Sequence, residues 1–553
     1  MSWKELHRKK YVMDNITQSQ AESNIVRKTN SQEYIYLSII IIVGLIIRVF
    51  VSWQDFATLF QKCVVDDALF YLNISKHIAE GKGATFDGFI LTNGFHPVYA
   101  LILVPLFWLF PNNPDLTFHL ALTICSIFNV LTGVVIHFTT KNIAGRNAGL
   151  IASFLWIFNP YVILISLNGV EVSVACFFLS LCIYKFVKMR KIDSYSSRDI
   201  ILLGVLSATA ILGRVDAVFL LMAITFFIFY AVYKKEEKII PSIAQPALFC
   251  GVVFAVLAPW FYWNLYHFGT IRQISGVTLP NISHNMYLMK YKTYFSFAFI
   301  LYELNYLKLW ILSTLKYSGG VLFFCVLFAV FIFVGREHLI QNIRKLLAQM
   351  KYIDFAILST GILVSFYSLY FWGWHRPWYY LSVMLVVTIC TGIIMENILL
   401  HLTVSNSAGP MNKKRDATLY LALLFYFSLQ GNQIWMKGLF PFQKQLYESA
   451  VWMNENTEKD ATIGAISSGS YGYFTHRAID LLGVVNNEAY RAIKAKKIFA
   501  YMKKKNIKYL VDREDMIRFF SERFDENGFM GKMLPIKKFG DKDSDIVVYR
   551  IIY

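Results

Sequence analysis

Residues 34–53 read YIYLSIIIIVGLIIRVFVSW, a run in which Arg48 is the only charged side chain. A helix needs about 20 apolar residues to cross a hydrocarbon core of about 30 Å, so this run is long enough to span a membrane. The polar stretch before it is rich in Asn, Ser and Gln and is too long for the charged start of a cleaved signal peptide. The sequence therefore predicts a retained first transmembrane helix, preceded by a cytoplasmic N-terminal segment at residues 1–33.

Similar apolar runs recur along the chain, in which 56% of the residues are hydrophobic. Together with the first run they predict about eleven crossings, and they exclude a soluble protein. The run at 97–110 is too short to cross and ends in Pro111-Asn-Asn-Pro114, so we expect a helix that lies in or dips into the membrane interface. The other predicted crossings lie near 116–138, 147–166, 172–188, 199–213, 217–233, 246–264, 312–334, 353–372, 380–400 and 417–434.

The formal net charge of +18 would suit a protein that binds nucleic acid, but the Lys and Arg residues gather in short stretches between the apolar runs. Such stretches are topology signals, because basic loops stay on the cytoplasmic side. With the amino terminus inside, every predicted inside loop is basic, so one topology satisfies the whole chain. No nucleic acid is expected as a partner. The same topology places a first loop at 54–115 and a carboxy-terminal region at 435–553 outside.

The carboxy-terminal region alternates helical stretches with short β-type runs at 461–467, 508–512 and 546–552, which predicts a small α/β domain. We therefore expect an all-α polytopic membrane domain at 34–434, whose first outer loop carries the chemistry. An extracytoplasmic soluble α/β domain at 435–553 should follow it.

Asp66 and Asp67 are neighbours in the first outer loop, within Val65-Asp-Asp-Ala-Leu-Phe-Tyr-Leu72, which opens a helix. Either residue could simply cap this helix, because Asp is favoured at the N-cap and in the first turn. Two adjacent carboxylates are more than one cap requires, and like charges close together raise one pKa while the other group stays ionised. The pair therefore also suits proton abstraction or cation binding.

The same loop continues with Leu91-Thr-Asn-Gly-Phe-His-Pro97. Asn93 and Gly94 predict a turn, and Pro97 suits the first position of the following helix. His96 could serve only to cap that helix. Its place beside the membrane surface also allows His96, together with Asn93, to bind the phosphate or another part of a substrate.

Five more polar residues lie near the outer ends of predicted spans, at a depth where an ionisable group is costly and usually functional. Two could form a structural ion pair, and the Trp and Tyr residues around two others could be an aromatic belt. All five nevertheless fall on the outer side, although the topology follows from the Lys and Arg counts alone. This predicts an outer cavity for a substrate with an anionic head group and a lipid tail, with Arg as a bidentate phosphate clamp. The five residues are Glu171, the pair Arg214 and Asp216, and His375 with Arg376.

These residues resemble the motifs of the GT-C superfamily of membrane glycosyltransferases. The likeness rests on the acidic pair with Phe70-Tyr-Leu72, on Thr92-Asn-Gly-Phe-His-Pro97, and on DLLGVVNN at 480–487, which resembles a segment common in the outer domains of the family. The first-loop motifs look like those of prokaryotic members. The chain is similar in layout to the protein O-mannosyltransferases, the lipid A aminoarabinose transferase and the mycobacterial terminal arabinofuranosyltransferase.

The resemblance implies an inverting glycosyltransferase that moves a hexose or pentose from a polyprenyl-phosphate donor to an acceptor hydroxyl. The reaction would take place at the outer face of a prokaryotic cell membrane, on a glycan, lipid or protein acceptor of the cell envelope, with membrane lipids around the enzyme. One member of the acidic pair would be the general base, and the family's use of the first acid favours Asp66. The pair is Asp-Asp here, whereas the mannosyltransferases have Asp-Glu.

Two other functions fit parts of the pattern. A transporter or flippase of lipid-linked sugars would also use intramembrane Arg and Asp, but such proteins are commonly built from repeated halves, and the sequence shows no repeat. A receptor or assembly protein would bind its partner through the outer domain. A divalent cation, Mg²⁺ or Mn²⁺, is an open cofactor because paired carboxylates near phosphate suit such ions, although basic residues could also neutralise the phosphate unaided.

Overall fold

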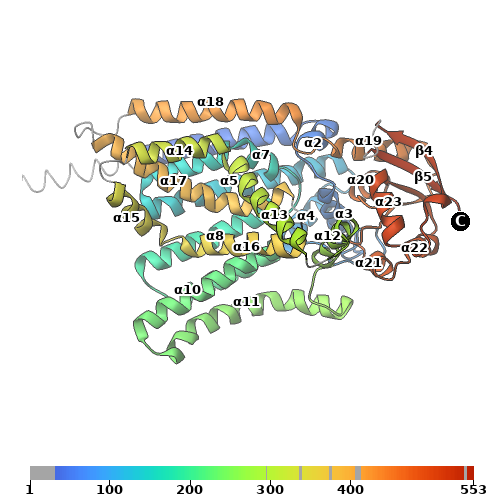
Figure 1. The fold of residues 1–553 in the computed structure, drawn as a ribbon, viewed down its shortest axis with the longest axis horizontal. Helices are drawn as coiled ribbons and strands as arrows, with labels where there is room; N and C mark the ends of the chain where they lie inside the picture. The colour runs from blue at the N-terminus through green and yellow to red at the C-terminus, as the bar shows by residue number, and fades with distance from the viewer. Residues whose placement is uncertain (1–30, 294–295, 335–338, 373–375, 405–412, 541–544) are drawn as a thin grey trace, which may run out of the picture.

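The chain forms an elongated bundle of helices with a small β-sheet at one end (Figure 1). The prediction for His375 and most of the predicted cytoplasmic segment fall outside the described residues. This computed structural model describes residues 31–553 except 294–295, 335–338, 373–375, 405–412 and 541–544.

Seven helices of the described residues are long and apolar enough to cross a membrane, or up to nine if each of two bent pairs forms one crossing. The predicted all-α polytopic membrane protein with a small C-terminal α/β part is confirmed, while the count of about eleven crossings stays a prediction. Two predicted crossings outside this set coincide with α9 (Ser197–Gly213) and α18 (Lys413–Lys437). The seven are Ser31–Ser52, α5 (Pro114–Ala144), α8 (Val172–Ile192), η1 with α10 (Val215–Ala217 and Val218–Glu236), α11 (Ile239–Phe268), α16 (Asp354–Phe371) and η3 with α17 (Pro377–Tyr380 and Leu381–Val404).

Further helices complete the bundle and its end. The predicted short apolar helix is present as α4, whose 13 residues reach only about 20 Å and cannot cross a membrane. The bent pairs are α6 (Arg146–Phe158) with α7 (Pro160–Ser166), and α13 (Phe297–Ser318) with α14 (Val321–Val334). The remaining helices are α2 (Phe56–Lys62), α3 (Asp67–Ala79), α4 (Pro97–Leu109), α12 (Ser275–Tyr291) and α15 (Leu339–Met350).

The two breaks have local causes. Between α6 and α7, which meet at 59°, Pro160 removes a backbone donor and Asn159 caps the new helix by accepting from the Tyr161 amide at 2.9 Å. Between α13 and α14, which meet at 82°, Gly319 and Gly320 have φ angles of 151° and 100°. A residue with a Cβ rarely adopts such angles, so the glycines permit the sharp turn.

Arg48, the charged residue of the first apolar run, is fully buried inside the bundle. Its guanidinium donates to Asn129 Oδ1 at 2.8 and 3.0 Å and to the carbonyl oxygens of Gly44 and Ile157 at 3.1 and 2.9 Å. An ionisable side chain within a membrane span is tolerated when it faces other helices and finds polar partners there. Arg48 therefore ties the first helix to α5 and α6.

The C-terminal region contains a five-stranded sheet in the order β2-β1-β3-β5-β4. Strand β1 runs parallel to its neighbours β2 and β3, whereas β5 pairs antiparallel with both β3 and β4. Three of these strands match the predicted β-type runs. The strands are β1 (Thr462–Ala465), β2 (Ala478–Asp480), β3 (Ile507–Arg513), β4 (Met533–Phe539) and β5 (Ile546–Ile551), and the helices are α19 (Gln443–Asn456), α20 (Gly469–Thr475), α21 (Asn487–Lys494), α22 (Ile498–Lys504), α23 (Glu514–Arg523) and η4 (Met530–Lys532).

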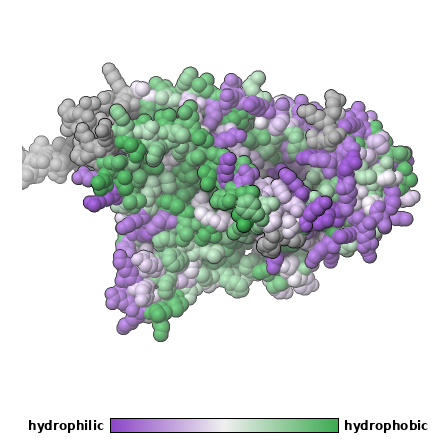
Figure 2. Space-filling view, in the orientation of Figure 1, coloured by the Kyte–Doolittle hydropathy of each residue, from purple (hydrophilic) through white to green (hydrophobic). Residues whose placement is uncertain are grey.

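The first loop packs directly against the C-terminal region. The rings of Phe60 and Tyr447 stack with centroids 5.4 Å apart, and Phe56 meets Phe474 edge to face at 5.6 Å. Both predicted outer regions therefore share one end of the molecule, while α15 lies at the other end (Figure 1). Figure 2 shows hydrophobic surface over the bundle and more hydrophilic surface over the end that carries the sheet. The membrane side that each end faces stays a prediction.

Candidate functional site

A large cavity of about 1300 Å³ lies between the helical bundle and the C-terminal region. Part of its lining is apolar and comes from α10, α11 and α16, including Phe219, Trp260 and Phe366. Other parts are polar and come from the first loop, from the segments after α9 and α16, and from the C-terminal region. The polar residues predicted from the sequence that line this cavity are Asp66, Asp67, His96, Glu171, Arg214, Asp216 and Arg376.

Asp66 is buried, and its carboxylate meets the first residues of α20. Its Oδ2 accepts from the Gly469 amide at 2.8 Å, and its Oδ1 accepts from the amide and hydroxyl of Ser470 at 2.6 and 2.8 Å. Burial raises the pKa of Asp66, and the hydrogen bonds from Ser470 and Gly469 counteract part of that rise. Since both oxygens already accept hydrogen bonds, Asp66 joins the first loop to the C-terminal region.

Asp67 is the first residue of α3, and its side chain is exposed to the cavity. Within the described part of the chain, no hydrogen bond to its carboxylate is found. The surrounding cavity walls limit hydration and raise the pKa of Asp67 to about 7; the neighbouring Asp66 charge adds to the rise, and Arg376 opposes it. A carboxylate with this pKa is suited to accept a proton near neutral pH.

Arg214 is held by a buried charged network at the end of α9. Its Nε donates to Asp216 at 2.7 Å, its Nη1 donates to Glu171 at 2.5 Å, and its Nη2 donates to the Tyr367 hydroxyl at 3.0 Å. The Tyr367 hydroxyl in turn donates to Asp216 at 2.9 Å. A buried charge is tolerated when it is paired and hydrogen-bonded in this way. The alternative of a structural ion pair for Arg214 and Asp216 therefore has direct geometric support.

His96 continues this network toward the first loop. Its Nδ1 lies 2.9 Å from the Tyr71 hydroxyl and 3.5 Å from the Glu171 carboxylate. Burial lowers the pKa of His96 although Glu171 opposes the shift, whereas burial of Glu171 is outweighed by His96 and Arg214, so that its pKa is lowered. The ring of His96 therefore lines the cavity as a neutral group beside an ionised carboxylate.

Arg376 differs from Arg214 because it is exposed to the cavity. It precedes Pro377, the first residue of η3, and lies close enough to Asp67 to lower the pKa of that carboxyl. Trp378 and Tyr379 line the cavity beside it. The cavity thus brings the guanidinium of Arg376 near the carboxylate of Asp67.

Asn93 does not line the cavity and is fully buried. Its amide nitrogen donates to Asn264 Oδ1 at 2.7 Å and to the carbonyl oxygen of Arg272 at 3.0 Å, and its Oδ1 accepts from the Ile274 amide at 3.2 Å. These contacts hold the last turns of α11 and the segment after it against the first loop. The predicted substrate-binding role of Asn93 is therefore replaced by a structural one in our assignment.

The C-terminal region contributes to the cavity, which was not predicted from the sequence. Four polar residues at the strand ends of this region line it, just after strand β1 and at or just beyond the carboxyl end of strand β3, and Gln443 at the start of α19 lines it too. The available signal was their position after β-type runs, since the carboxyl ends of neighbouring parallel strands meet at one edge of a sheet. The sequence predicted the strands but not that β1 and β3 are parallel neighbours. The four residues are Ser467, Asp512, Arg513 and Asp515.

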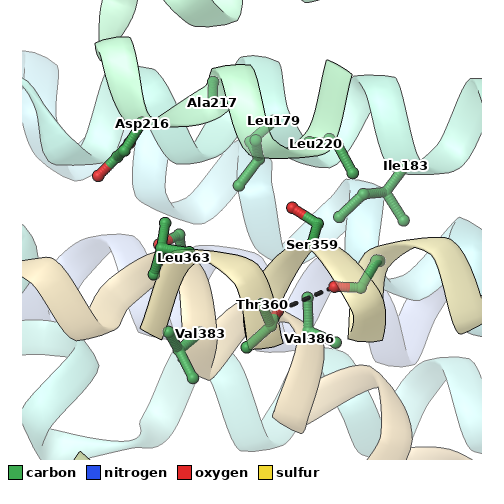
Figure 3. A pocket seen from close by; sticks show the side chains of 12 residues that line it. Leu179, Ile183, Asp216, Ala217, Leu220, Ser359, Thr360, Leu363, Val383 and Val386 are labelled. Atoms are coloured by element: carbon green, nitrogen blue, oxygen red, sulfur yellow. Dashed lines mark hydrogen bonds between the residues drawn. The ribbon is translucent and has the colours of Figure 1, made fainter. Parts of the chain in front are cut away.

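A second, much smaller cavity of about 20 Å³ lies between α8, α10, α16 and α17 (Figure 3). Asp216 lines both cavities, but the other side chains around the small one are mostly aliphatic. Thr360 turns its hydroxyl to the Ala356 carbonyl oxygen at 2.9 Å. This volume has room for about one water molecule and none for a substrate.

Among the described residues, no group of three or more His, Cys, Asp and Glu side chains is arranged to hold a metal ion. The nearest candidate, the acidic pair, has one carboxylate occupied by the amides of α20. The described side chains therefore form no ready-made site of this kind. A divalent cation stays a prediction, and we derive no step through a metal.

Comparisons with known proteins find similarity to mannosyltransferases over part of the chain. Residues 97–263 match the family described as dolichyl-phosphate-mannose-protein mannosyltransferase, and residues 433–549 match a domain of unknown function, DUF8728. The chain is 27% identical over 164 residues to GPI mannosyltransferase 1 of Saccharomyces cerevisiae, a match that covers 30% of this chain. The match spans 36% of the length of that curated relative.

Two solved structures resemble the whole architecture. The archaeal oligosaccharyltransferase AglB from Archaeoglobus fulgidus, in complex with an inhibitory peptide and a dolichol-phosphate, aligns with a TM-score of 0.51 at 14% identity over 88% of this chain and 70% of its own. ArnT from Cupriavidus metallidurans, bound to undecaprenyl phosphate, aligns with a TM-score of 0.51 at 11% identity over 92% of this chain and 97% of its own. At such identities the likeness concerns the fold.

Proposed function

We propose that the chain is a membrane glycosyltransferase of the GT-C superfamily, and that it transfers a sugar from a polyprenyl-phosphate donor to an acceptor hydroxyl. The likeness of its fold to AglB and ArnT and the family match over residues 97–263 support this proposal. The observation that carries this proposal is the composition of the large cavity. An apolar wall from α10, α11 and α16 and a polar lining with an exposed carboxylate and guanidinium share one space. The apolar wall suits a lipid tail, the guanidinium suits a phosphate, and the carboxylate suits a hydroxyl nucleophile. The structural relatives that hold dolichol-phosphate or undecaprenyl phosphate support this choice of donor.

Asp67 is the general base in this proposal. Its carboxylate faces the cavity with a pKa of about 7, whereas the carboxylate of Asp66 is buried and accepts three hydrogen bonds from α20. A base must reach the hydroxyl whose proton it removes, so access decides between the two. We therefore assign Asp66 to positioning, although the family habit favours it as the base.

The reaction is a single displacement. Asp67 takes the proton of the acceptor hydroxyl while the oxygen of that hydroxyl forms a bond to the anomeric carbon of the sugar. The bond between that carbon and the phosphate oxygen breaks, and its electron pair leaves with the lipid phosphate. Attack opposite the leaving group inverts the anomeric configuration. Positive charge beside the phosphate stabilises the negative charge that develops there.

Arg376 is the donor-phosphate ligand in this scheme. It is exposed to the cavity, and its guanidinium can donate two parallel hydrogen bonds to phosphate oxygens. Arg214 already donates to Glu171, Asp216 and Tyr367, so a direct phosphate contact would cost it these partners. Arg214, with His96 and Glu171, instead forms part of the cavity wall.

The basic loops support an outer location for the cavity. The cavity lies at the end that carries the first loop and the C-terminal region, away from α15 and its basic residues Arg344 and Lys345 (Figure 1). If basic loops stay inside, the cavity faces the outer side of a prokaryotic cell membrane. Cell-envelope glycans, lipids and proteins are the acceptors available there.

A transfer assay with purified protein in lipid nanodiscs tests the proposal. Radiolabelled polyprenyl-phosphate sugars, hexoses and pentoses in separate reactions, are supplied with a membrane-envelope extract, and the label is followed into non-lipid or larger-lipid products. We expect one donor to release its label and the lipid phosphate in equal amounts. Movement of intact donor across a liposome membrane without cleavage would instead support a flippase and overturn the proposal.

A further inference from the structure

Residues at the carboxyl ends of two strands of the C-terminal sheet line part of the large cavity. Strand β1 lies between β2 and β3 and is parallel to both, and the chain leaves β1 through α20 to β2 on one side before it crosses to β3 on the other. In open sheets of this kind, ligands bind outside the carboxyl ends of the strands where the order reverses. Here that point lies between β1 and β3.

The side chains at this point line the same cavity as Asp67. We call them the strand-end crevice. It presents two carboxylates, one guanidinium, one hydroxyl and one aromatic ring. The crevice consists of Ser467, Asp512, Arg513 and Asp515 from the strand ends, together with Phe442, which precedes α19.

Internal contacts fix the chemistry that the crevice offers. The Asp512 carboxylate is buried and accepts from the amides of Ser467 and Arg513, and burial raises its pKa to about 6, against the effect of these hydrogen bonds. Arg513 donates to the Asp515 carboxylate and has its guanidinium 5.9 Å from the centre of the Phe442 ring. A paired carboxylate and guanidinium beside a ring suit hydroxyl groups, which both accept and donate hydrogen bonds.

The crevice is poorly suited to a phosphate. The amides of Gly469 and Ser470, which an anion would need, already donate to Asp66. The amide of Ser467, two residues before Gly469, donates to Asp512. With two carboxylates and one guanidinium, the crevice has excess negative charge when both acids are ionised. The expected ligand is therefore neutral and rich in hydroxyl groups.

We propose that the strand-end crevice binds the acceptor, and that the acceptor is a saccharide. This inference rests on the proposed glycosyl transfer and names the chemical class of its second substrate, the acceptor. The crevice lies beside the base because Asp66 contacts Gly469 and Ser470, two and three residues after Ser467, and Asp67 is the next residue of the chain. The Asp66 charge also reaches Asp512, whose pKa it helps to raise. A sugar held at the strand ends can thus bring a hydroxyl to Asp67.

Two families of acceptor test this inference with the full-length protein in nanodiscs. Octyl glycosides of several sugars offer a saccharide, and 1-octanol offers a hydroxyl on the same chain without one. We expect the unsubstituted protein to prefer at least one octyl glycoside over 1-octanol by at least about tenfold in kcat/KM. Equal or better use of 1-octanol would overturn the saccharide assignment.

Variants then locate the site. Arg513→Ala and Asp515→Asn should raise KM for the preferred glycoside by at least about tenfold, since each removes hydrogen bonds to hydroxyls. Their transfer to 1-octanol and their affinity for undecaprenyl phosphate should change less than about threefold. Arg518→Ala is the matched control, because Arg518 lies on α23, is exposed and does not line the cavity. It should leave the glycoside KM unchanged.

The failures of the two proposals are distinguishable. If no donor is cleaved with any acceptor, glycosyl transfer itself is wrong. If transfer occurs but both crevice variants keep the glycoside KM of the unsubstituted protein, only the crevice assignment is wrong. If the crevice variants lose transfer to the glycoside and to 1-octanol alike and also melt at a lower temperature, the crevice residues serve only to stabilise the fold. That result would also overturn the assignment.

Discussion

The carboxylate of Asp66 accepts a hydrogen bond of 2.6 Å from the backbone amide of Ser470, across 404 positions of the chain. With the Gly469 amide and the Ser470 hydroxyl, it forms a joint between the first loop and the C-terminal region. The same joint leaves Asp67 as the accessible member of the acidic pair. The contact of Asp66 with α20 therefore both holds the C-terminal region in place and leaves Asp67 as the candidate base.

Removal of this joint should weaken the attachment of the C-terminal region. Asp66→Ala leaves two amides and a hydroxyl without their acceptor, which we expect to cost at least about 2 kcal/mol. The melting temperature of the purified protein should fall, and limited proteolysis should release the C-terminal region sooner. Asp67→Asn is the control, and it should leave both readouts unchanged. Equal stability of Asp66→Ala and the unsubstituted protein would show that the joint is dispensable.

The rate of transfer should depend on pH through Asp67. The base must be ionised, and the pKa of Asp67 is raised to about 7, mainly because the cavity walls limit hydration. We expect kcat/KM to fall about tenfold per pH unit below pH 7 and to level off above it. Initial rates between pH 5 and about 9 measure this, with a phosphodiester donor that does not titrate in the range. A profile that is flat through pH 7 would exclude Asp67 with this pKa as the base.

Arg376 should control donor affinity. Arg376→Ala removes a guanidinium that faces the cavity near Asp67, and we expect the dissociation constant for undecaprenyl phosphate to rise by about tenfold or more. Arg376→Lys should restore only part of the affinity, because it keeps the charge and loses the planar fork. Arg518→Ala controls for the loss of a surface charge. Unchanged affinity in both Arg376 variants would remove this residue from the donor site.

The orientation of the molecule can be read by cysteine labelling in intact cells. Asn527 lies in the C-terminal region and Ser197 in a predicted inside loop, and both are exposed. A membrane-impermeant maleimide should label Asn527→Cys directly and Ser197→Cys only after permeabilisation, with the unsubstituted chain as background. The reverse pattern would place the cavity on the cytoplasmic side.

The helical part of the fold was predictable because its signal is local. Runs such as 34–53 have the length and composition of a membrane span whatever surrounds them. The number of crossings was less secure, since α9 is only 17 residues long and two other predicted spans are sharply bent. Strand order in the C-terminal sheet depends on long-range pairing, which leaves little trace in a single sequence.

The sequence predicted which residues form the candidate site, but not which of them is structural and which faces the substrate. Charge and position indicated Asp66, Asp67, Arg214 and Arg376 together. Only the folded chain distinguishes the carboxylate that α20 occupies from the one that faces the cavity. In the same way, Glu171 pairs with Arg214 across 43 positions, and no pattern in the sequence announces that contact.

Transfer by Asp67→Asn and by Asp66→Asn, measured side by side with the cognate polyprenyl-phosphate sugar, tests the central claim most directly. We expect Asp67→Asn to bind the donor and melt like the unsubstituted protein while its transfer rate falls by at least about a hundredfold, as expected for a lost general base. Asp66→Asn should lose less activity and more stability, because one of its former acceptor oxygens becomes an amide nitrogen. Near-normal transfer by Asp67→Asn, beside an inactive but stably folded Asp66→Asn, would contradict the account and return the role of base to Asp66.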